Sequence, residues 1–301
     1  MSVVVQDLSK HYGEQKALNQ VSFTAKKGEI VGLLGPNGAG KTTTMKILTC
    51  FIPQTSGLAE VCGFDVTKDP IEVRRKIGYL PEHNPLYKDM YIKEYLGFVA
   101  GLYRIKNKKE RVAEMIEIVG LEKEQHKRIQ ALSKGYRQRV GLAQSMMHDP
   151  EVLILDEPTS GLDPNQLSEI RNLIRSIGKE KTVIFSSHIM QEVQAICDKV
   201  IIINNGNLVA NDSIESLQNN KRESAYLIIE TKATLPQELL LKEDFIQEIK
   251  SIGGTKYRLI GSNKVDLREK VFNFAVKHKV TLLELHLEKT SVEDIFQELT
   301  K

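Results

Sequence analysis

Residues 35–42 form a glycine-rich segment whose residue types and spacing suit phosphate binding. They read Gly-Pro-Asn-Gly-Ala-Gly-Lys-Thr and match the pattern G-x-x-x-x-G-K-[ST]. Glycines let several backbone N–H groups turn toward one anion, and a helix that starts there adds partial positive charge. Lys41 can bring a full charge to the β- and γ-phosphates, and the Thr42 hydroxyl can ligate Mg²⁺. The segment predicts a nucleoside triphosphate site, with a glycine-rich turn that binds nothing as the alternative.

The residues on either side favour the functional interpretation. The apolar run 30–34 before the segment predicts a buried strand, and Met45, Ile47, Leu48 and Phe51 after it recur at helical spacing. A strand, a glycine loop and a helix, in that order, are the context that this motif requires.

Two acidic residues follow another apolar run. Asp156 and Glu157 come directly after residues 152–155, which are continuously apolar, as in strands buried within a parallel sheet. Asp156 is placed to hold Mg²⁺ through water, and Glu157 could polarise the water that attacks the γ-phosphate. Alone, such a pair is more often a solvated turn, but beside a phosphate loop it predicts catalysis.

A second segment has the features of an anion site. Ser133 is a good N-cap for a helix that carries Val140 on its apolar face, and Lys134 and Gly135 follow it. A capped basic helix is the simpler alternative. Two phosphate-binding edges far apart in one chain predict a two-fold dimer in which each nucleotide lies between one edge from each copy.

Composition sets the class of protein. The chain has 301 residues, 41% hydrophobic and 27% charged, and a net charge of +3, which is typical of a globular protein with no strong attraction for nucleic acid. Three distant cysteines, Cys50, Cys62 and Cys197, indicate reduced thiols in a cytoplasmic compartment. We expect neither a signal peptide nor a membrane span, because no window approaches 18 consecutive apolar residues.

Alternating elements predict a parallel α/β domain over residues 1–217. The expected strands are 2–8, 18–25, 29–34, 58–66, 152–155, 182–187 and 199–203, and the expected helices are 164–178 and 189–197, with a helical segment inserted over about 88–150. A polar linker over 212–224 precedes a second domain at 225–301. Its expected strands are 225–231, 255–260 and 281–287, and its expected helices lie near 238–252, 266–278 and 291–299.

Six segments stand in the order found in one known family. They are Tyr12 in Lys-His-Tyr-Gly, the loop 35–42, the run 132–136, the strand 152–156 with Glu157, the run 160–163, and His188 after Phe-Ser-Ser. On these segments, residues 2–215 resemble the nucleotide-binding subunits of ATP-binding cassette (ABC) transporters. The resemblance implies an α/β P-loop NTPase fold of ABC type, with an antiparallel β subdomain, an inserted helical subdomain and a small C-terminal α+β accessory domain.

The resemblance also implies a role for each matching residue. The implied catalytic residues are Glu157 as base, His188 at the γ-phosphate and Lys41. The implied nucleotide-binding residues are Tyr12, which would stack on adenine, and Gly35, Pro36, Asn37, Gly38, Ala39, Gly40, Lys41, Thr42 and Thr43. The run implied to bind the nucleotide of the second copy is Ser133, Lys134, Gly135 and Tyr136, and the loop implied to cross the dimer interface is Ser160, Gly161, Leu162 and Asp163. Mg²⁺ would be held by Thr42, Glu82 and Asp156.

Two positions depart from the usual family pattern. Lys134 stands where the signature L-S-G-G-Q has a glycine, and Glu82 stands where a glutamine usually contacts Mg²⁺. Both resemble the subgroup that serves ABC-2-type exporters, and the run Thr-Ser-Val-Glu-Asp-Ile-Phe-Gln-Glu-Leu-Thr at 290–300 resembles the end of its accessory domain. Residues 80–87 and 132–140 resemble the gliding-motility-associated ATP-binding subunit.

The implied protein is the ATPase motor of an exporter. It would act as a dimer with itself and with an integral-membrane permease, at the inner face of the cell membrane. An ABC-type ATPase acting on ribosomes or DNA, or a regulatory ATP binder, are the alternatives. Only 91 residues separate Lys41 from Leu132, which leaves no room for the coiled coil of chromosome ATPases. A single cassette is also unlike most ribosome factors.

Overall fold

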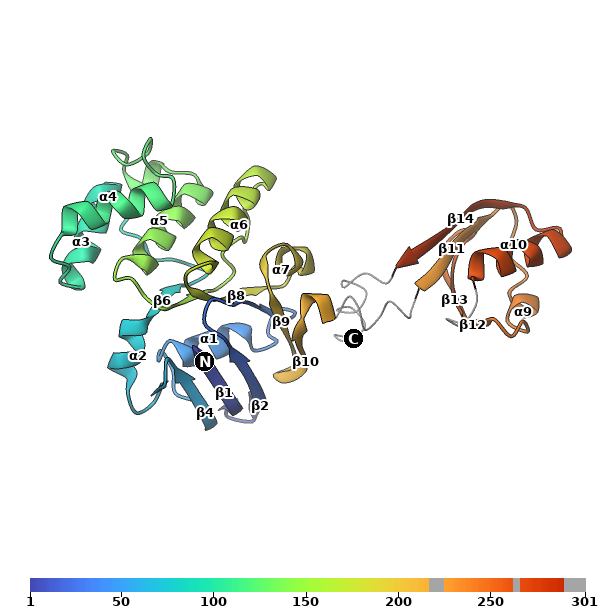
Figure 1. Cartoon of the computed structure of the whole chain (residues 1–301), viewed down its shortest axis with the longest axis horizontal. Coiled ribbons are helices and arrows are strands. Elements are labelled where there is room, and N and C mark those ends of the chain that lie inside the picture. The colour runs from blue at the N-terminus through green and yellow to red at the C-terminus, as the bar shows by residue number, and fades with distance from the viewer. Residues whose placement is uncertain (217–224, 262–265, 290–301) are drawn as a thin grey trace. The chain divides into compact units, whose positions relative to one another are not determined.

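The computed structural model describes residues 1–216, 225–261 and 266–289. These residues form two compact units, the first over Met1–Ile214 and the second beginning at Glu215 (Figure 1). In the part of the chain that the structure describes, no helix has the length and apolar character needed to cross a membrane.

An antiparallel sheet begins the first unit. Its strands are β1 (Val3–Tyr12), β2 (Gln15–Ala25), β4 (Ser56–Val61) and β5 (Phe64–Asp65), in the order β2-β1-β4-β5. The single strand expected over 58–66 is two strands, because Cys62 and Gly63 both have positive φ angles and turn the chain between them. The antiparallel subdomain is confirmed.

A six-stranded sheet forms the centre of this unit, in the order β10-β9-β3-β8-β7-β6. Its strands are β3 (Ile30–Leu34), β6 (Ile77–Leu80), β7 (Val152–Leu155), β8 (Thr182–Ser187), β9 (Lys199–Asn204) and β10 (Asn207–Ser213). All neighbours pair in parallel except β10, which is antiparallel to β9. The predicted parallel α/β sheet is confirmed, although the sequence did not predict β6 or β10.

Helices lie around these sheets. They are α1 (Lys41–Leu48), α2 (Pro70–Lys76), α3 (Ile92–Leu102), α4 (Lys108–Ile118), α5 (Lys134–Met146), α6 (Pro164–Gly178) and α7 (Met190–Ile196). The helices α3, α4 and α5 pack together as a group between β6 and β7 in the chain (Figure 1). The inserted helical subdomain is therefore present, and its last helix leads directly to β7.

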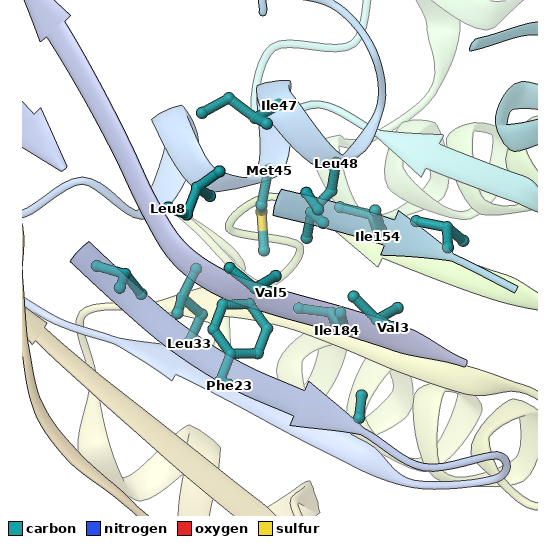
Figure 2. Close-up of a cluster of buried hydrophobic side chains, with 14 of the residues drawn as sticks. Val3, Val5, Leu8, Phe23, Leu33, Met45, Ile47, Leu48, Ile154 and Ile184 are labelled. Atoms are coloured by element: carbon teal, nitrogen blue, oxygen red, sulfur yellow. The ribbon is translucent and has the colours of Figure 1, made fainter. Parts of the chain in front are cut away.

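The largest hydrophobic cluster fixes the helix that follows the glycine loop. Met45, Ile47 and Leu48 of α1 are fully buried among side chains of both sheets, including Val5 and Ile184 (Figure 2). Burying a side chain of this size contributes about 1.5–3 kcal/mol to folding. The N-terminal end of α1 is thus held in a fixed place relative to the carboxyl ends of the parallel strands.

The second unit is an antiparallel sheet with helices on one face (Figure 1). Its strands are β11 (Ala225–Thr231), β12 (Ile246–Gly253), β13 (Lys256–Gly261) and β14 (Leu282–Lys289), in the order β12-β13-β11-β14, and its helices are α9 (Gln237–Leu240) and α10 (Leu267–Lys277). Leu227, Ile229 and Leu259 pack against Val271 and Phe274 of α10. This is the expected α+β arrangement.

The prediction of a helix near 238–252 is wrong. The structure has only the short helix α9 there, followed by the strand β12. Gly253 and Gly254 adopt positive φ angles and reverse the chain, so that Ser251 pairs with Tyr257 across a hairpin. Pairing with β13 therefore prevails over the helical spacing of the sequence. The helix expected near 291–299 and most of the linker lie outside the described residues.

Candidate nucleotide site

A polar cleft of about 450 Å³ lies at the N-terminal end of α1. Its lining comes from segments that are distant in sequence: Asn37, Gly38, Gly40, Lys41, Thr42, Thr43, Glu82, Glu157, Ser160 and His188. The glycine loop, the predicted base and the predicted histidine are therefore brought together. Gly35, Pro36, Ala39 and Asp156 are not among the lining residues, but Gly35 and Pro36 accept hydrogen bonds from Lys41 and Asp156 accepts one from Thr42.

The loop conformation requires its glycines. Gly40 has a φ of 113°, and a Cβ there would lie 2.7 Å from the carbonyl oxygen of Ala17. A Cβ on Gly35 would lie 2.2 Å from the carbonyl oxygen of Ile203. Gly40 is the N-cap of α1 and supplies no side-chain capping bond, so the first N–H groups of the helix are available to an anion.

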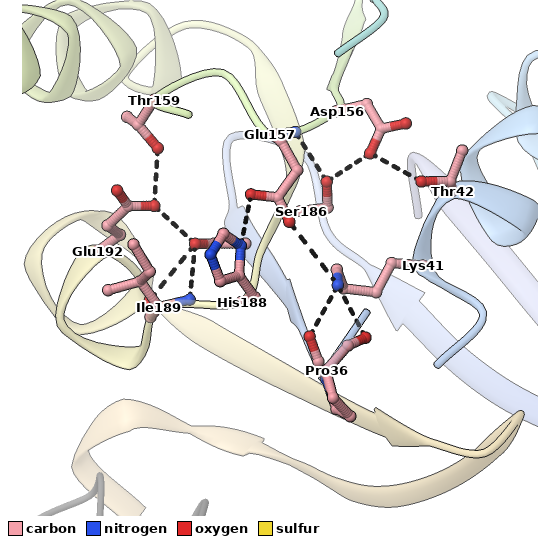
Figure 3. A network of polar contacts seen from close by, with 12 residues as sticks. Pro36, Lys41, Thr42, Asp156, Glu157, Thr159, Ser186, His188, Ile189 and Glu192 are labelled. Atoms are coloured by element: carbon pink, nitrogen blue, oxygen red, sulfur yellow. Dashed lines mark hydrogen bonds and ion pairs between the residues drawn. The ribbon is translucent and has the colours of Figure 1, made fainter. Parts of the chain in front are cut away.

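Lys41 is the buried cation of the site, with only 6% of its surface exposed. Its Nζ donates to the carbonyl oxygens of Gly35 at 2.7 Å and Pro36 at 3.1 Å, and it lies 3.7 Å from the Glu157 carboxylate (Figure 3). Burial lowers the pKa of Lys41, while the carboxylates of Glu157 and Asp156 oppose that shift. The ammonium group is thus held at the loop by contacts that a phosphate could replace.

Asp156 is buried at the end of β7 and faces α1. Its Oδ1 accepts hydrogen bonds from the Ser186 hydroxyl at 2.6 Å and from the Thr42 hydroxyl at 3.3 Å. Ser186, on the neighbouring strand β8, also accepts from the backbone N–H of Glu157 at 2.9 Å. The hydroxyl of Ser186 thereby fixes both acidic residues, and sequence reasoning did not single it out.

The donors fit Mg²⁺ that arrives with a nucleotide. Within residues 1–216, 225–261 and 266–289, no three acidic, histidine or cysteine side chains gather into a metal cage. Mg²⁺ usually keeps several waters and binds through one or two carboxylates plus substrate phosphates. The hydroxyl of Thr42 and the carboxylate of Asp156 are hard oxygen donors of this kind, and Glu82 lines the same cleft.

Glu157 and His188 form a close pair in the cleft. The Glu157 Oε2 lies 3.0 Å from the His188 Nδ1 (Figure 3). An ionised carboxylate can only accept, so the proton belongs on Nδ1 and Nε2 is left for another partner. Burial raises the pKa of Glu157, while the nearby His188 and Lys41 lower it. A carboxylate with a raised pKa is suited to accept a proton from water.

The run from Ser133 to Tyr136, which corresponds to the family signature, lies outside the nucleotide cleft. Ser133 caps α5, as expected, by accepting from the Tyr136 N–H at 3.3 Å. Within residues 1–216, the lining of the cleft includes none of the run from Ser133 to Tyr136. The Gln166 Nε2 of α6 donates to the Ser133 hydroxyl at 3.4 Å. A Cβ on Gly135 would lie 2.7 Å from the side chain of Gln166. This run therefore forms a separate edge together with the start of α6.

The loop 160–163 contacts that edge. The Lys134 ammonium group lies so close to Gly161 that a Cβ there would be 2.4 Å from it. Asp163 caps α6 by accepting from two backbone N–H groups, and Ser160 lines the cleft. Leu162 is partly buried. The loop thus joins the nucleotide cleft to the signature edge within one copy.

Tyr12 stands at the end of β1 and is 49% exposed. The Lys10 ammonium group lies 5.1 Å from the centre of its ring. Tyr12 is not among the residues that line the cleft. The ring is accessible, but the structure does not bring it together with the other predicted residues.

Comparisons with known proteins identify the family. A sequence profile described as "ABC transporter" matches residues 18–160. The ABC transporter ATP-binding protein NatA of Bacillus subtilis is 38% identical over 228 residues, which is 73% of this chain and 93% of NatA. The bacitracin transport ATP-binding protein BcrA of Bacillus licheniformis is 36% identical over 307 residues, covering 99% of this chain and 98% of BcrA.

Solved structures give the same result for the fold. A structure described as the ATP binding subunit of an ABC transporter superposes with a TM-score of 0.66 at 28% identity, over 73% of this chain and 93% of that one. The likeness to BcrA extends through both units of the chain.

Proposed function

Because this chain belongs to the family of ABC transporter ATP-binding subunits and is an ATPase of that fold, we propose that it is the motor of an ABC-2-type exporter. In this proposal it powers a separate membrane permease from the inner face of the cell membrane. The observation that carries the proposal is the cleft in which Lys41, Glu157 and His188 meet at the glycine loop. The sequence similarity to BcrA, which spans 99% of this chain, supports the exporter class in this proposal.

The side chains of the cleft account for hydrolysis of MgATP. Lys41 and the N–H groups at the start of α1 offset charge on the transferring phosphoryl group. Glu157 orients the attacking water and takes its proton, and His188 supports the γ-phosphate through its free nitrogen. Thr42 and Asp156 would hold Mg²⁺, which would supply further neutralisation of the negative charge on the nucleotide.

A second copy of the chain completes the site in this proposal. The edge formed by Ser133 and Gly135 has an exposed hydroxyl and a helix N-terminus, but it is separate from the cleft. A two-fold arrangement would place this edge of one copy on the nucleotide of the other. Loss of the γ-phosphate would then remove the bridge between the copies and let them separate.

A second groove, of about 650 Å³, suits the permease. It runs between the end of α1 and the helices α3 and α5, and it is lined by exposed apolar side chains that include Phe51, Tyr87 and Leu102. Apolar surface of this kind marks protein–protein contacts. Pro85 and Tyr87 line the groove, while Glu82, three residues earlier, lines the nucleotide cleft. In this proposal the segment 82–87 transmits motion between the nucleotide cleft and the groove.

A single charge in the groove should release the permease. Leu102 is 67% exposed there. Leu102→Glu should weaken co-purification of a polytopic protein from detergent-solubilised membranes about 30-fold, which corresponds to a loss of about 2 kcal/mol of binding free energy. ATPase activity of the isolated subunit should be unchanged. Ile118→Glu, at a 42% exposed apolar position on α4 outside the groove, is the matched control. Equal retention of the membrane protein by both variants would contradict the groove as the docking site.

The same purification tests the function itself. Ribosomes or DNA in place of a polytopic protein would favour the alternative ATPase, which the relatives do not support. The likeness of residues 80–87 and 132–140 to the gliding-motility-associated subunit leads us to assign this chain to gliding motility within the exporter subgroup. We assign residues 225–301 to an accessory domain that stabilises or regulates the dimer.

A further inference from the structure

Glu192 is a buried carboxylate that the mechanism above does not use. It lies in α7 with 2% of its surface exposed. Its Oε2 accepts hydrogen bonds from the Thr159 hydroxyl at 2.7 Å and from the Ser187 hydroxyl at 2.6 Å (Figure 3). Thr159 follows β7 and Ser187 ends β8, so one oxygen atom joins the segments that leave two neighbouring strands.

The charge of Glu192 is another unusual feature. Across residues 1–216, 225–261 and 266–289, no lysine, arginine or histidine lies within ion-pair distance of it. Burying a carboxylate is costly unless its hydrogen bonds are made, and here two hydroxyl groups supply them. A carboxylate buried with neutral partners alone is an expensive way to stabilise a fold, and both of its contacts lead to the nucleotide cleft.

The first contact leads to His188. The Ser187 hydroxyl donates to Glu192 and accepts from the backbone N–H of Ile189 at 3.0 Å. These two bonds fix the chain on either side of His188. The ring of His188 then lies 3.0 Å from the carboxylate of Glu157. The orientation of the histidine therefore depends on where Glu192 holds the hydroxyl of Ser187.

The second contact leads to the base and to the interface loop. Thr159 stands two residues after Glu157 and directly before Ser160, which lines the cleft. Its bond to Glu192 is buried. The carboxylate of Glu192 thus holds the segment that carries Glu157 and the segment that carries His188 at a fixed separation.

We propose that Glu192 is a positioning residue that clamps Thr159 to Ser187 and thereby keeps Glu157 and His188 in their reactive arrangement. The inference rests on the proposed function, since it concerns the geometry of the same hydrolytic site. Glu192 does not line the cleft and so does not touch the nucleotide directly. Its loss should therefore alter the rate of hydrolysis and leave nucleotide affinity nearly intact.

The test is steady-state ATPase kinetics on the full chain. A misplacement of about 1 Å in a catalytic group can cost roughly 100-fold in rate. Glu192→Ala should lower kcat by about 10- to 100-fold and change KM for ATP by less than about twofold. Glu192→Gln retains an acceptor oxygen for both hydroxyls and should recover most of the rate. Glu180→Ala, at an exposed position near the end of α6, serves as the control.

A second set of variants covers the case in which Glu192→Ala folds poorly. Thr159→Val removes one hydroxyl at nearly constant shape and should itself lower kcat. Where Glu192→Ala folds, Thr159→Val added to it should cause less loss than the two single effects combined, because both remove the same hydrogen bond. Where it does not fold, an unchanged kcat in Thr159→Val alone would overturn the clamp. Full additivity, an unchanged kcat in Glu192→Ala, or an effect on KM alone would overturn the clamp. A wild-type chain without ATPase activity would instead overturn the proposed function.

Discussion

Replacing Glu157 by glutamine should lower ATP turnover by about two to four orders of magnitude while MgATP still binds. The amide has nearly the same shape as the carboxylate, so the backbone bond to Ser186 and the contact with His188 can persist. It cannot take a proton from the attacking water. Removing the carboxylate also removes a negative charge 3.7 Å from the Lys41 ammonium, which favours retention of the triphosphate.

Phosphate release under saturating ATP measures this effect, and equilibrium binding of MgATP to the same preparation verifies that the site is intact. Glu72→Gln is a matched control, because Glu72 pairs with Arg75 on the surface of α2, outside the cleft. It should hydrolyse ATP like the wild type. Turnover within twofold of the wild type in Glu157→Gln would exclude Glu157 as the base.

Replacing Lys41 by alanine should cost nucleotide affinity as well as rate. A hydrogen bond to a charged group is worth about 1.5–3 kcal/mol, which corresponds to about a 10- to 150-fold increase in Kd. The rate should fall further, because the ammonium offsets charge that develops on the transferring phosphoryl group. Among the residues that the structure describes, Nζ contacts two loop carbonyls and Glu157, all within the cleft, so the fold should remain stable without it.

Fluorescent-nucleotide titration reports the change in affinity, and thermal unfolding without nucleotide reports the fold. Lys68→Ala is the control, since its side chain is 80% exposed and outside the cleft. It should bind MgATP with wild-type affinity. If Lys41→Ala binds MgATP as tightly as the control does, the loop is not the phosphate site.

The glycine loop could be predicted from sequence because its physics is local. The strand β3, the turn that needs Gly40 and the helix α1 follow one another directly, so spacing alone defines them. The same holds for Ser133, whose capping bond spans three residues. Patterns of this kind do not depend on the order of strands in the sheet.

The hydrogen-bond network behind the cleft could not be predicted in this way. Ser186 reaches Asp156 because β8 lies beside β7, and Glu192 reaches Thr159 because α7 directly follows β8 in the chain. Strand order is a tertiary property that hydrophobic spacing does not encode. The position of Ser186 and Ser187 directly before His188 was the one available signal in the sequence.

In some segments the local pattern did not predict even the secondary structure. Residues 246–253 have apolar side chains compatible with a helix, yet they pair with β13 after the glycine turn at 253–254. In the first unit, β6 has only four residues and includes a glycine, and β10 is largely polar, so neither run has a clear apolar pattern. Tertiary pairing decided the conformation in each of these cases.

The central proposal is that the nucleotide cleft is half of a site and that a second copy supplies the other half. Sedimentation equilibrium of Glu157→Gln tests this most directly, because the slow variant keeps its ATP. With saturating MgATP it should have the mass of two copies, and without nucleotide the mass of one. Adding Ser133→Arg, which blocks the signature edge but lies outside the cleft, should return the mass to one copy while MgATP still binds. A mass of one copy for Glu157→Gln with MgATP fully bound would contradict the composite site.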